Sequence, residues 1–340
     1  MSGVASHMKA FAVERYGKGE TGRVIDVPTP TLRDDDVLVE VHAAGVNVLD
    51  VKIRNGEFKP ILPYRLPLIL GHDIAGRVVG VGPGVRGFRV GDEVHARPDD
   101  FRIGGFAQYI AVREGALARK PGNLSMVEAA SLPLVALTAW QVLVETAALQ
   151  RGQKVFIEAG SGGVGTVAIQ LARHLGAFVA TSTGTANVEW VRALGADVVI
   201  DHRTQDVAAE LRDHDVVLHS LGSDALATAL QVLRPGGRLV SISGPPTPAF
   251  AERRKLSWLL RQGMRVLSHG IRRKAARRGV AYDFVFMRAD GAQLARITEL
   301  VETGAIRPTI DRVFPFEATA DALAHVARGH ARGKVVVQVR

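Results

Sequence analysis

The stretch VFIEAGSGGVGTVAIQLA at residues 155–172 decides the fold. A short apolar strand pattern leads into six glycine-rich residues, and the apolar spacing that follows is that of a helix. Glycines at 160, 162 and 165 allow a tight turn, a close backbone approach to a ligand, and contact between strand and helix. The helix N-terminus also offers free N–H groups to an anion. The stretch therefore predicts a turn that binds a dinucleotide pyrophosphate through Gly160, Ser161, Gly162, Gly163, Val164 and Gly165.

The residues that follow alternate between strand and helix patterns. Short runs rich in β-branched and apolar residues lie at 178–181, 198–201, 215–219 and 238–243. Apolar residues at three- and four-residue spacing separate these runs at 187–194, 205–211 and 224–233. This rhythm with short connections is typical of an α/β domain with a doubly wound parallel sheet.

The first 130 residues have a different pattern, which indicates a mostly β domain. Strand patterns at 36–43, 75–81, 91–96 and 108–112 lie between Gly, Pro and Asp turns. Ser125 with Glu128 fits a helix N-cap with a capping box. A final strand at 334–339 is expected to return to this domain. We therefore predict one domain at 8–131 completed by 313–340, and a second at 132–312 with a basic helical insertion at 247–279.

Composition indicates a globular chain with an ample core. Of the 340 residues, 47% are hydrophobic, and no uninterrupted apolar run approaches the roughly 20 residues of a membrane span. The chain has no cysteine, which excludes disulfides and thiolate metal sites. Residues 1–7 lack the apolar centre of a signal peptide, and Ser6-His7-Met8 is typical of a cloning remnant. We expect a native start at Met8 and a cytoplasmic protein.

Five motifs, taken with the glycine turn, resemble those of the medium-chain dehydrogenase/reductases. They are AGVNVLDVK at 44–52, GHDIAG at 71–76, GDEV at 91–94, GFAQY at 105–109 and LTAW at 137–140. Their order and spacing are most similar to the zinc-free quinone oxidoreductases related to zeta-crystallin. The resemblance implies a GroES-like catalytic domain, a Rossmann domain, and hydride transfer from NADPH.

The same resemblance indicates that zinc is absent. Zinc alcohol dehydrogenases have a cysteine where this chain has Asn47, and their structural zinc lobe needs four cysteines. His72 matches a zinc ligand of those enzymes, but one imidazole cannot complete a site of three protein ligands. Without a Lewis acid, alcohol oxidation loses the means of lowering the hydroxyl pKa. We therefore expect reduction of a quinone or an α,β-unsaturated carbonyl, in which an oxyanion needs only hydrogen-bond donors and a proton source.

By the resemblance, the catalytic residues lie in the 44–52 motif, whose family counterpart is near the nicotinamide. Asn47 and Lys52 are the candidate donors to the oxyanion, and Asp50 is the candidate orienting group. A polar side chain at 47 interrupts an apolar run, which favours a functional role. For Asp50 a solvated Asp/Lys pair on a helical turn is the alternative.

The end of the second strand of the Rossmann pattern indicates which dinucleotide binds. An NAD enzyme usually has an acid about 20 residues after the glycines, whereas residues 181–187 read TSTGTAN. Hydroxyl and amide groups can donate to a 2′-phosphate, which a carboxylate would repel. We expect NADPH (NADP+) rather than NADH, with contacts from Ser182, Thr183, Asn187, His202 and Arg203; an ordinary surface role for Arg203 is the alternative.

The resemblance adds further cofactor contacts. Those near the nicotinamide and its ribose are Thr138, Leu221, Gly222, Ser243, Gly244 and Phe286, and Lys334 is expected near the cofactor phosphates. Packing is the alternative role for the glycines and apolar residues in this set.

Segment 252–278 contains ten Lys and Arg residues and one acid, so its net charge is +9. This equals the formal net charge of the whole chain. Its apolar residues fit a helix or a helical hairpin inserted between strands at 238–243 and 280–287. Such a segment suits an anionic membrane, an acidic protein, a roof over a site for anionic substrates, or only solvent. Nucleic acid is disfavoured because Trp258 is its only aromatic residue. We expect the segment to be an accessory surface outside the core.

These observations together predict an NADPH-dependent, zinc-free reductase of a small quinone or enone. The alternatives are a zinc-independent alcohol or aldehyde dehydrogenase, and an NADPH-binding scaffold without turnover. The predicted partner is the small-molecule substrate and not nucleic acid, while a homodimer and a peripheral contact with anionic membrane stay open.

Overall fold

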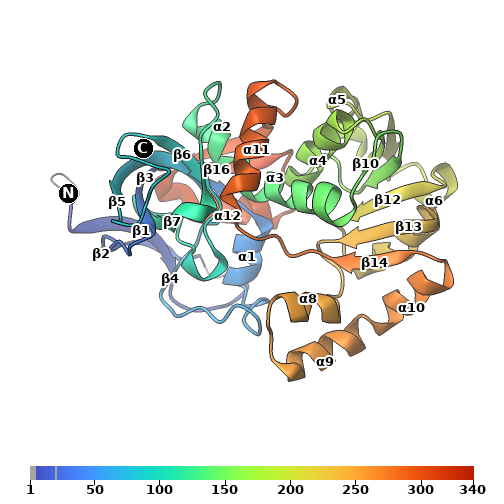
Figure 1. The fold of residues 1–340 in the computed structure, drawn as a ribbon, viewed down its shortest axis with the longest axis horizontal. Helices are drawn as coiled ribbons and strands as arrows, with labels where there is room; N and C mark the ends of the chain where they lie inside the picture. The colour runs from blue at the N-terminus through green and yellow to red at the C-terminus, as the bar shows by residue number, and fades with distance from the viewer. Residues whose placement is uncertain (1–4, 20) are drawn as a thin grey trace. The chain divides into compact units, whose positions relative to one another are not determined.

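The computed structural model describes residues 5–19 and 21–340 (Figure 1). The chain divides into two compact units: unit 1 comprises 1–137 and 288–340, and unit 2 comprises 138–287. Residues 1–4, part of the segment 1–7 for which no signal peptide is expected, lie outside the described residues. Within the described ranges, no helix combines the length and the apolar character needed to cross a bilayer.

Unit 1 is built on two β-sheets. The larger sheet has the strand order β15-β16-β3-β5-β6-β8, with β7 also paired to β3, and the smaller has the order β2-β1-β4. The bounds are β1 (His7–Val13), β2 (Arg23–Pro28), β3 (Asp36–Val46), β4 (Leu68–Ile69), β5 (Asp73–Val81), β6 (Glu93–Ala96), β7 (Tyr109–Arg113), β8 (Leu117–Arg119), β15 (Ile310–Pro315) and β16 (Lys334–Gln338). The predicted final strand does return, because β16 pairs antiparallel with β3 through Val335 and Val46.

Short helices complete unit 1. They are α1 (Val48–Arg54), α2 (Met126–Ala130), α11 (Gly291–Glu302) and α12 (Thr319–Ala327), and α3 (Pro133–Trp140) contains the boundary after residue 137. The predicted capping box starts α2: Ser125 N donates to Glu128 Oε2 at 2.8 Å, and Glu128 N donates to Ser125 Oγ at 3.3 Å. The structure thus confirms the predicted helix start.

The end of unit 2 differs from the predicted boundary at residue 312. Helix α11 belongs to unit 1, where a Cβ on Gly291 would lie 2.3 Å from Leu117 O. Farther along α11, Thr298 Oγ1 lies 3.0 Å from His95 Nε2. Because these contacts join residues far apart in the sequence, helical periodicity alone could not assign α11 to its unit.

Unit 2 contains a six-stranded parallel sheet of order β11-β10-β9-β12-β13-β14. Its elements are β9 (Lys154–Ile157), α4 (Gly163–His174), β10 (Phe178–Thr183), α5 (Val188–Ala193), β11 (Val198–Asp201), α6 (Val207–Glu210), β12 (His214–His219), α7 (Leu226–Val232), β13 (Leu233–Ser241), α8 (Pro248–Arg253), α9 (Trp258–Leu267), α10 (His269–Arg277) and β14 (Ala281–Phe284). The chain order changes direction between β9 and β12, which confirms the predicted doubly wound α/β sheet.

The basic insertion, residues 247–279, forms α8, α9 and α10 and is here called the basic arm. It is the orange segment between β13 and β14 in Figure 1. The expectation that it lies outside the core is wrong for α10. Ile271 and Ala275 are buried in one apolar cluster with Val217 and Leu239 of the central strands. Deleting the arm would therefore expose core side chains of unit 2.

Candidate active site

The glycine turn after β9 has the geometry that the sequence predicts. Gly160 N donates to Ser182 O at 2.9 Å, and a Cβ on Gly160 would lie 2.3 Å from Thr181 Oγ1. A Cβ on Gly165 would lie 2.3 Å from Ala159 O. Neither position can therefore hold a larger residue without moving the turn, and Ala159 itself adopts a left-handed φ of 53°.

Gly162 has space around it, unlike the other two glycines. Its φ is −81°, which any residue can adopt, and the nearest atom to an added Cβ would be Ala159 O at 3.3 Å. It is the N-cap of α4, whose first N–H groups have no acceptor within the helix. Gly162 is thus less crowded than Gly160 and Gly165, and it lies at the position where helix N–H groups and the helix dipole favour an anion.

We predict that Gly162→Val leaves unit 2 folded but weakens dinucleotide binding by more than about 10-fold, since the side chain fills the space left for the pyrophosphate. Fluorescence titration with NADPH measures the affinity, and thermal unfolding measures the fold. Gly165→Val is the matched comparison and is expected to lower the unfolding temperature. Unchanged NADPH affinity in Gly162→Val would contradict the assignment of the turn.

A buried carboxylate connects the glycine turn to the loop after β12. Glu158 Oε2 accepts from Ser220 N at 3.0 Å and from Leu221 N at 3.2 Å. The same oxygen lies 2.7 Å from Nδ1 of His219, whose side chain is fully buried. These residues follow β9 and β12, where the strand order reverses, and ligands of open α/β sheets bind beside such a point. Glu158 therefore holds together the two loops that flank the predicted dinucleotide site.

The loops after β12 and β13 also contact each other. The Ser243 hydroxyl donates to Leu221 O, and Gly244 N donates to Ser241 Oγ at 2.7 Å. Leu221 is 42% exposed, and a Cβ on Gly222 would have open space around it. The structure thus brings Leu221, Gly222, Ser243 and Gly244 to one end of the sheet.

The two remaining predicted nicotinamide residues lie elsewhere in unit 2. Thr138 is buried in α3. Phe286 follows β14, its ring centroid is 6.3 Å from that of Phe250, and the guanidinium of Arg254 lies over the ring. Phe286 therefore packs against the start of the basic arm.

The predicted ribose residues gather around Gly184, after β10. A Cβ on Gly184 would lie 3.4 Å from Arg203 Nε and 3.8 Å from His202 Cε1. Ser182 and Thr183 are buried, and Thr183 Oγ1 has no hydrogen-bond partner among the described residues. By contrast, Asn187 Oδ1 already accepts a hydrogen bond from Trp190 Nε1 at 3.1 Å. The side-chain amide of Asn187 is therefore only partly available to a ligand.

An acid also lies near this group, at the end of β11 rather than β10. Asp201 accepts a hydrogen bond from Arg203 N at 3.0 Å. The pKa of its carboxyl is lowered, and the largest cause is the hydrogen bond from the Thr185 hydroxyl. The carboxylate thus already accepts hydrogen bonds within the chain, and Asp201 ends β11 rather than β10, the strand after which an NAD enzyme usually has its ribose acid.

In unit 1, the 44–52 motif meets the 71–76 motif in a buried polar network. Lys334 Nζ donates to Asn47 Oδ1 at 2.6 Å, to Asp73 Oδ2 at 3.0 Å and to Val46 O at 3.1 Å. Asn47 Nδ2 donates to Asp73 Oδ2 at 2.9 Å and to Gly45 O at 3.3 Å. Asp73 Oδ1 accepts from Leu134 N at 2.7 Å. Every polar group of this network is therefore paired.

These contacts change the roles expected of two residues. Lys334 was predicted near the cofactor phosphates, but its three N–H donors all serve acceptors within unit 1. Likewise, both amide donors of Asn47 are used, so it could donate to an oxyanion only by releasing Asp73 or Gly45. Both residues are buried, at 5% exposure. The geometry assigns them to the framework of the motif.

Asp50 is fully buried and does not form the solvated pair with Lys52 that was the alternative. Its Oδ2 accepts from Asn47 N at 2.8 Å, which forms a capping box at the start of α1. Its Oδ1 accepts from Gly71 N at 3.1 Å and lies 2.6 Å from His72 Nδ1. An ionised carboxylate can only accept, so this contact is a hydrogen bond in the tautomer that carries the imidazole proton on Nδ1. Asp50 thus fixes both the helix start and the imidazole of His72.

Lys52 lies on the next turn of α1 and is half-buried. No side-chain ion pair or hydrogen bond joins its ammonium to another residue in the part of the chain that the structure describes. Of the three residues predicted to be catalytic, Lys52 alone has its donors available to a ligand.

The residues around His72 do not fit a catalytic zinc. Its Nε2 is buried without a hydrogen-bond partner among the described residues, which is one feature of a metal ligand. However, Asp73 is paired with Lys334, an amide takes the cysteine position, and the chain has no cysteine. Residues 5–19 and 21–340 contain no group of three His, Cys, Asp or Glu side chains placed to hold a metal. A site of three protein ligands therefore cannot form there without rearrangement.

Sequence reasoning missed Glu158, His219 and Asp201. Glu158 is the only charged residue in the 155–172 stretch, which was a signal for a functional or paired role. Its partner His219 is 61 residues away, so the pair could not be found from local spacing.

Comparison with known proteins agrees with this geometry. Residues 33–122 match the family model of the alcohol dehydrogenase GroES-like domain, and residues 194–337 match that of the zinc-binding dehydrogenase. The NAD(P)H oxidoreductase RTN4IP1, mitochondrial, of Mus musculus is 35% identical over 355 residues, which cover 98% of this chain and 89% of the relative.

Two further proteins extend the comparison. The NADPH-dependent alkenal/one oxidoreductase, chloroplastic, of Arabidopsis thaliana is 32% identical over 345 residues, covering 98% of this chain and 80% of the relative. The structure of the quinone oxidoreductase from Coxiella burnetii superposes with a TM-score of 0.83 at 29% identity, covering 98% of this chain and 100% of that chain. Together with the paired GroES-like and Rossmann architecture, these matches show that the chain belongs to the oxidoreductases of the medium-chain dehydrogenase/reductase superfamily.

Proposed function

We propose that this oxidoreductase uses NADPH to reduce quinones or α,β-unsaturated carbonyl compounds, and that it does so without zinc. The observation that carries the proposal is the glycine turn at the N-terminus of α4, which lies beside the point where the strand order reverses. The relatives point the same way, since two of those compared are an alkenal/one oxidoreductase and a quinone oxidoreductase.

The residues of unit 2 would bind and orient the dinucleotide, which supplies the hydride when bound. The N–H groups of Gly163, Val164 and Gly165 at the N-terminus of α4 would bind the pyrophosphate. Glu158 holds the Ser220–Leu221 backbone, and Gly222 in the loop that follows would contact the ribose of the nicotinamide. Such contacts would orient the cofactor before reaction, so less orientational freedom would be lost at the hydride-transfer step.

In unit 1, we propose that Lys52 donates to the oxygen that becomes negatively charged when hydride arrives. An ammonium donor aimed at developing charge lowers the barrier more than it strengthens substrate binding. Asp50 acts as a positioning residue, because it fixes the start of the helix that carries Lys52. Asn47 supports the same motif through Asp73 and Lys334.

The proposal of zinc independence rests on the donor set. Alcohol oxidation needs a group that lowers the hydroxyl pKa, and His72 has no second and third ligand beside it among the described residues. Reduction of a quinone or enone needs no deprotonation before hydride transfer. A zinc-independent reductase is therefore the reaction type that suits these residues.

The proposal of NADPH rather than NADH rests on the residues around Gly184. We predict that Arg203→Ala weakens NADPH binding by about 10-fold, because a charge-assisted hydrogen bond to the 2′-phosphate is lost, and leaves NADH binding unchanged. Calorimetric titration of both cofactors measures this difference. Arg212→Ala removes an exposed charge on another loop and is the matched control. Equal affinity of the unmodified protein for NADPH and NADH would contradict the proposal.

A panel of acceptors tests the reaction type. We expect NADPH oxidation with a simple naphthoquinone and with an enone, and much slower oxidation with a saturated aldehyde. Preference for the aldehyde would favour an alcohol or aldehyde dehydrogenase, and NADPH binding without turnover of any acceptor would favour a scaffold. The proposed partner is thus a small molecule and not nucleic acid. A homodimer is compatible with this function. A cytoplasmic location is also compatible with it, and the mouse and Arabidopsis relatives named above are mitochondrial and chloroplastic.

A further inference from the structure

Helix α9 of the basic arm has both buried and exposed apolar side chains. Met264 is buried, at 5% exposure. Four side chains of α9 have the highest exposure of the large hydrophobic side chains among the described residues: Trp258, Leu259, Val266 and Leu267 are 68%, 73%, 75% and 68% exposed. Leu259 and Val266 are seven residues apart and therefore share one face of α9, and Trp258 and Leu267 lie at the two ends of the helix. We call these four side chains the apolar patch, and exposed apolar surface of this kind marks an interaction surface.

The basic side chains of the arm are mostly without an acidic partner among the described residues. Glu252 is the only acid of segment 252–278 and it pairs with Arg261. Arg253 donates to Phe284 O, and Arg254 lies over the Phe286 ring. In the part of the chain that the structure describes, no acidic partner lies within ion-pair distance of the seven other basic side chains, Lys255, Arg265, Arg272, Arg273, Lys274, Arg277 and Arg278.

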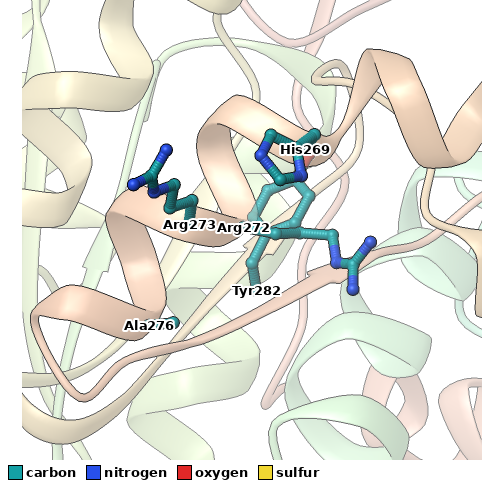
Figure 2. Close-up of a pocket in the computed structure, with 5 residues that line it drawn as sticks. All are labelled: His269, Arg272, Arg273, Ala276 and Tyr282. Carbon is teal, nitrogen blue, oxygen red and sulfur yellow. The ribbon is translucent and has the colours of Figure 1, made fainter.

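Some of these cations border a shallow hollow on the arm. It is lined by His269, Arg272, Arg273 and Ala276 of α10 and by Tyr282 of β14. Figure 2 shows Arg272 and Arg273 leaving α10 in different directions, on either side of His269 and Tyr282. The Tyr282 hydroxyl donates to Pro245 O, and burial raises its pKa to about 12, so the hollow contains no competing phenolate. The hollow therefore presents guanidinium donors suited to phosphate oxygens.

The arm holds these groups in a fixed arrangement. Ile271 and Ala275 anchor α10 in the core, and the Phe250 ring of α8 packs edge-on against Phe284 with centroids 5.1 Å apart. Ser257 caps α9, since its hydroxyl accepts from Leu260 N at 3.4 Å. Because the arm is anchored on one side, its apolar patch and its cations cannot be buried by folding back onto each other.

We propose that the basic arm docks unit 2 onto an anionic lipid membrane. Trp258, Leu259, Val266 and Leu267 would enter the interfacial region of the bilayer, while the unpaired Arg and Lys side chains pair with headgroup phosphates. Amphipathic helices with Trp and Leu on one face and cations beside it bind membranes in this way. This docking is independent of the reaction proposed above.

The charge of the arm favours an anionic membrane over a second copy of the chain as the binding partner. A two-fold interface would place the same patch of each copy face to face. Seven unpaired cations would then oppose seven others in a desolvated contact, which is unfavourable. An anionic membrane offers both hydrocarbon for the apolar patch and phosphate for the cations, so it matches both parts of the surface.

Cosedimentation of the full chain with lipid vesicles tests the proposal. We expect binding at low salt to vesicles of phosphatidylcholine mixed with phosphatidylserine, and little binding to pure phosphatidylcholine. Binding should fall as salt shortens the Debye length from about 30 Å at 0.01 M to about 3 Å at 1 M. An emission shift of Trp258 to shorter wavelength in a Trp140→Phe/Trp190→Phe background should accompany binding.

Two sets of substitutions separate the apolar and the charged contributions. Arg272→Gln/Arg273→Gln/Lys274→Gln should lower the partition coefficient about 100-fold, since each cation near an anionic surface contributes about fivefold. Trp258→Ser/Leu259→Ser should lower it by at least about 10-fold. Two control variants remove exposed residues elsewhere and should bind vesicles as the unmodified protein does. The charge control is Lys18→Gln/Arg65→Gln/Arg332→Gln, and the apolar control is Phe101→Ser. Circular dichroism of each variant checks the fold.

Three results would overturn the proposal. The first is no binding to anionic vesicles at low salt, and the second is equal binding to neutral and anionic vesicles. The third is full binding by both arm variants while they stay folded. If anionic vesicles fail to bind but immobilised polyglutamate retains the protein through the arm, the occupant is an acidic protein surface and the membrane proposal is wrong.

Discussion

Replacing Lys52 with Ala is expected to lower turnover with NADPH and a quinone by about 10²- to 10³-fold, the usual loss when one donor to a developing oxyanion is removed. NADPH affinity should stay within about twofold, because the cofactor turn belongs to unit 2 and Lys52 to unit 1. The effect should fall on kcat more than on KM, since the donor acts on charge that appears in the transition state. Steady-state kinetics with a parallel NADPH titration measures both quantities.

Two comparisons make this result specific to the ammonium. Lys52→Arg keeps a cation at the same turn of α1 and should retain part of the activity. Lys9→Ala removes an exposed lysine of β1 and should have no effect. If Lys52→Ala has the turnover of the unmodified protein, the oxyanion donor lies elsewhere and the proposed role of Lys52 is wrong.

Replacing Lys334 with Met is expected to lower the free energy of unfolding by about 3–5 kcal/mol, the usual cost of removing one partner of a buried ion pair. Lys334 is 5% exposed and Asp73 is fully buried, so the substitution leaves the Asp73 carboxylate desolvated with only amide donors. Met has nearly the length of Lys and limits the cavity left behind. Urea unfolding followed by circular dichroism measures the change, and Lys9→Met is the exposed control.

A double-variant cycle tests whether charge pairing is the cause. Asp73→Asn alone should also destabilise unit 1, because Lys334 then keeps its charge without a buried anion. The double variant Asp73→Asn/Lys334→Met should lose less than the sum of the two single losses, since no unpaired charge is left. Additive losses would show that packing, and not the ion pair, accounts for the effect of Lys334→Met.

Local chemistry made part of the structure predictable from the sequence. The glycine turn was predictable because its close packing requires glycine, which is visible in the sequence. At Gly160 and at Gly165, a neighbouring atom lies 2.3 Å from where a Cβ would be. Ser125 and Glu128 were found because a capping box joins residues three apart. The strands of unit 2 were found because a parallel sheet buried on both faces requires short apolar runs.

Contacts between distant residues were not predictable in this way. Lys334 lies 287 residues from Asn47 in the sequence and 261 from Asp73, yet the three share one buried network. A resemblance placed Lys334 near phosphates, while the topology of β16 beside β3 decides its partners. Similarly, the charge of the basic arm indicated an exposed surface, and only the packing of Ile271 and Ala275 shows that α10 also belongs to the core.

NADPH oxidation with naphthoquinone, before and after exhaustive dialysis against a chelator and with the zinc content determined, tests the central claim most directly. We expect turnover that does not change with chelation, in protein that contains far less than one zinc per chain, because the residues around His72 lack a complete ligand set. Loss of turnover on chelation with recovery on adding zinc, or no turnover of NADPH with any quinone or enone, would contradict a zinc-independent reductase.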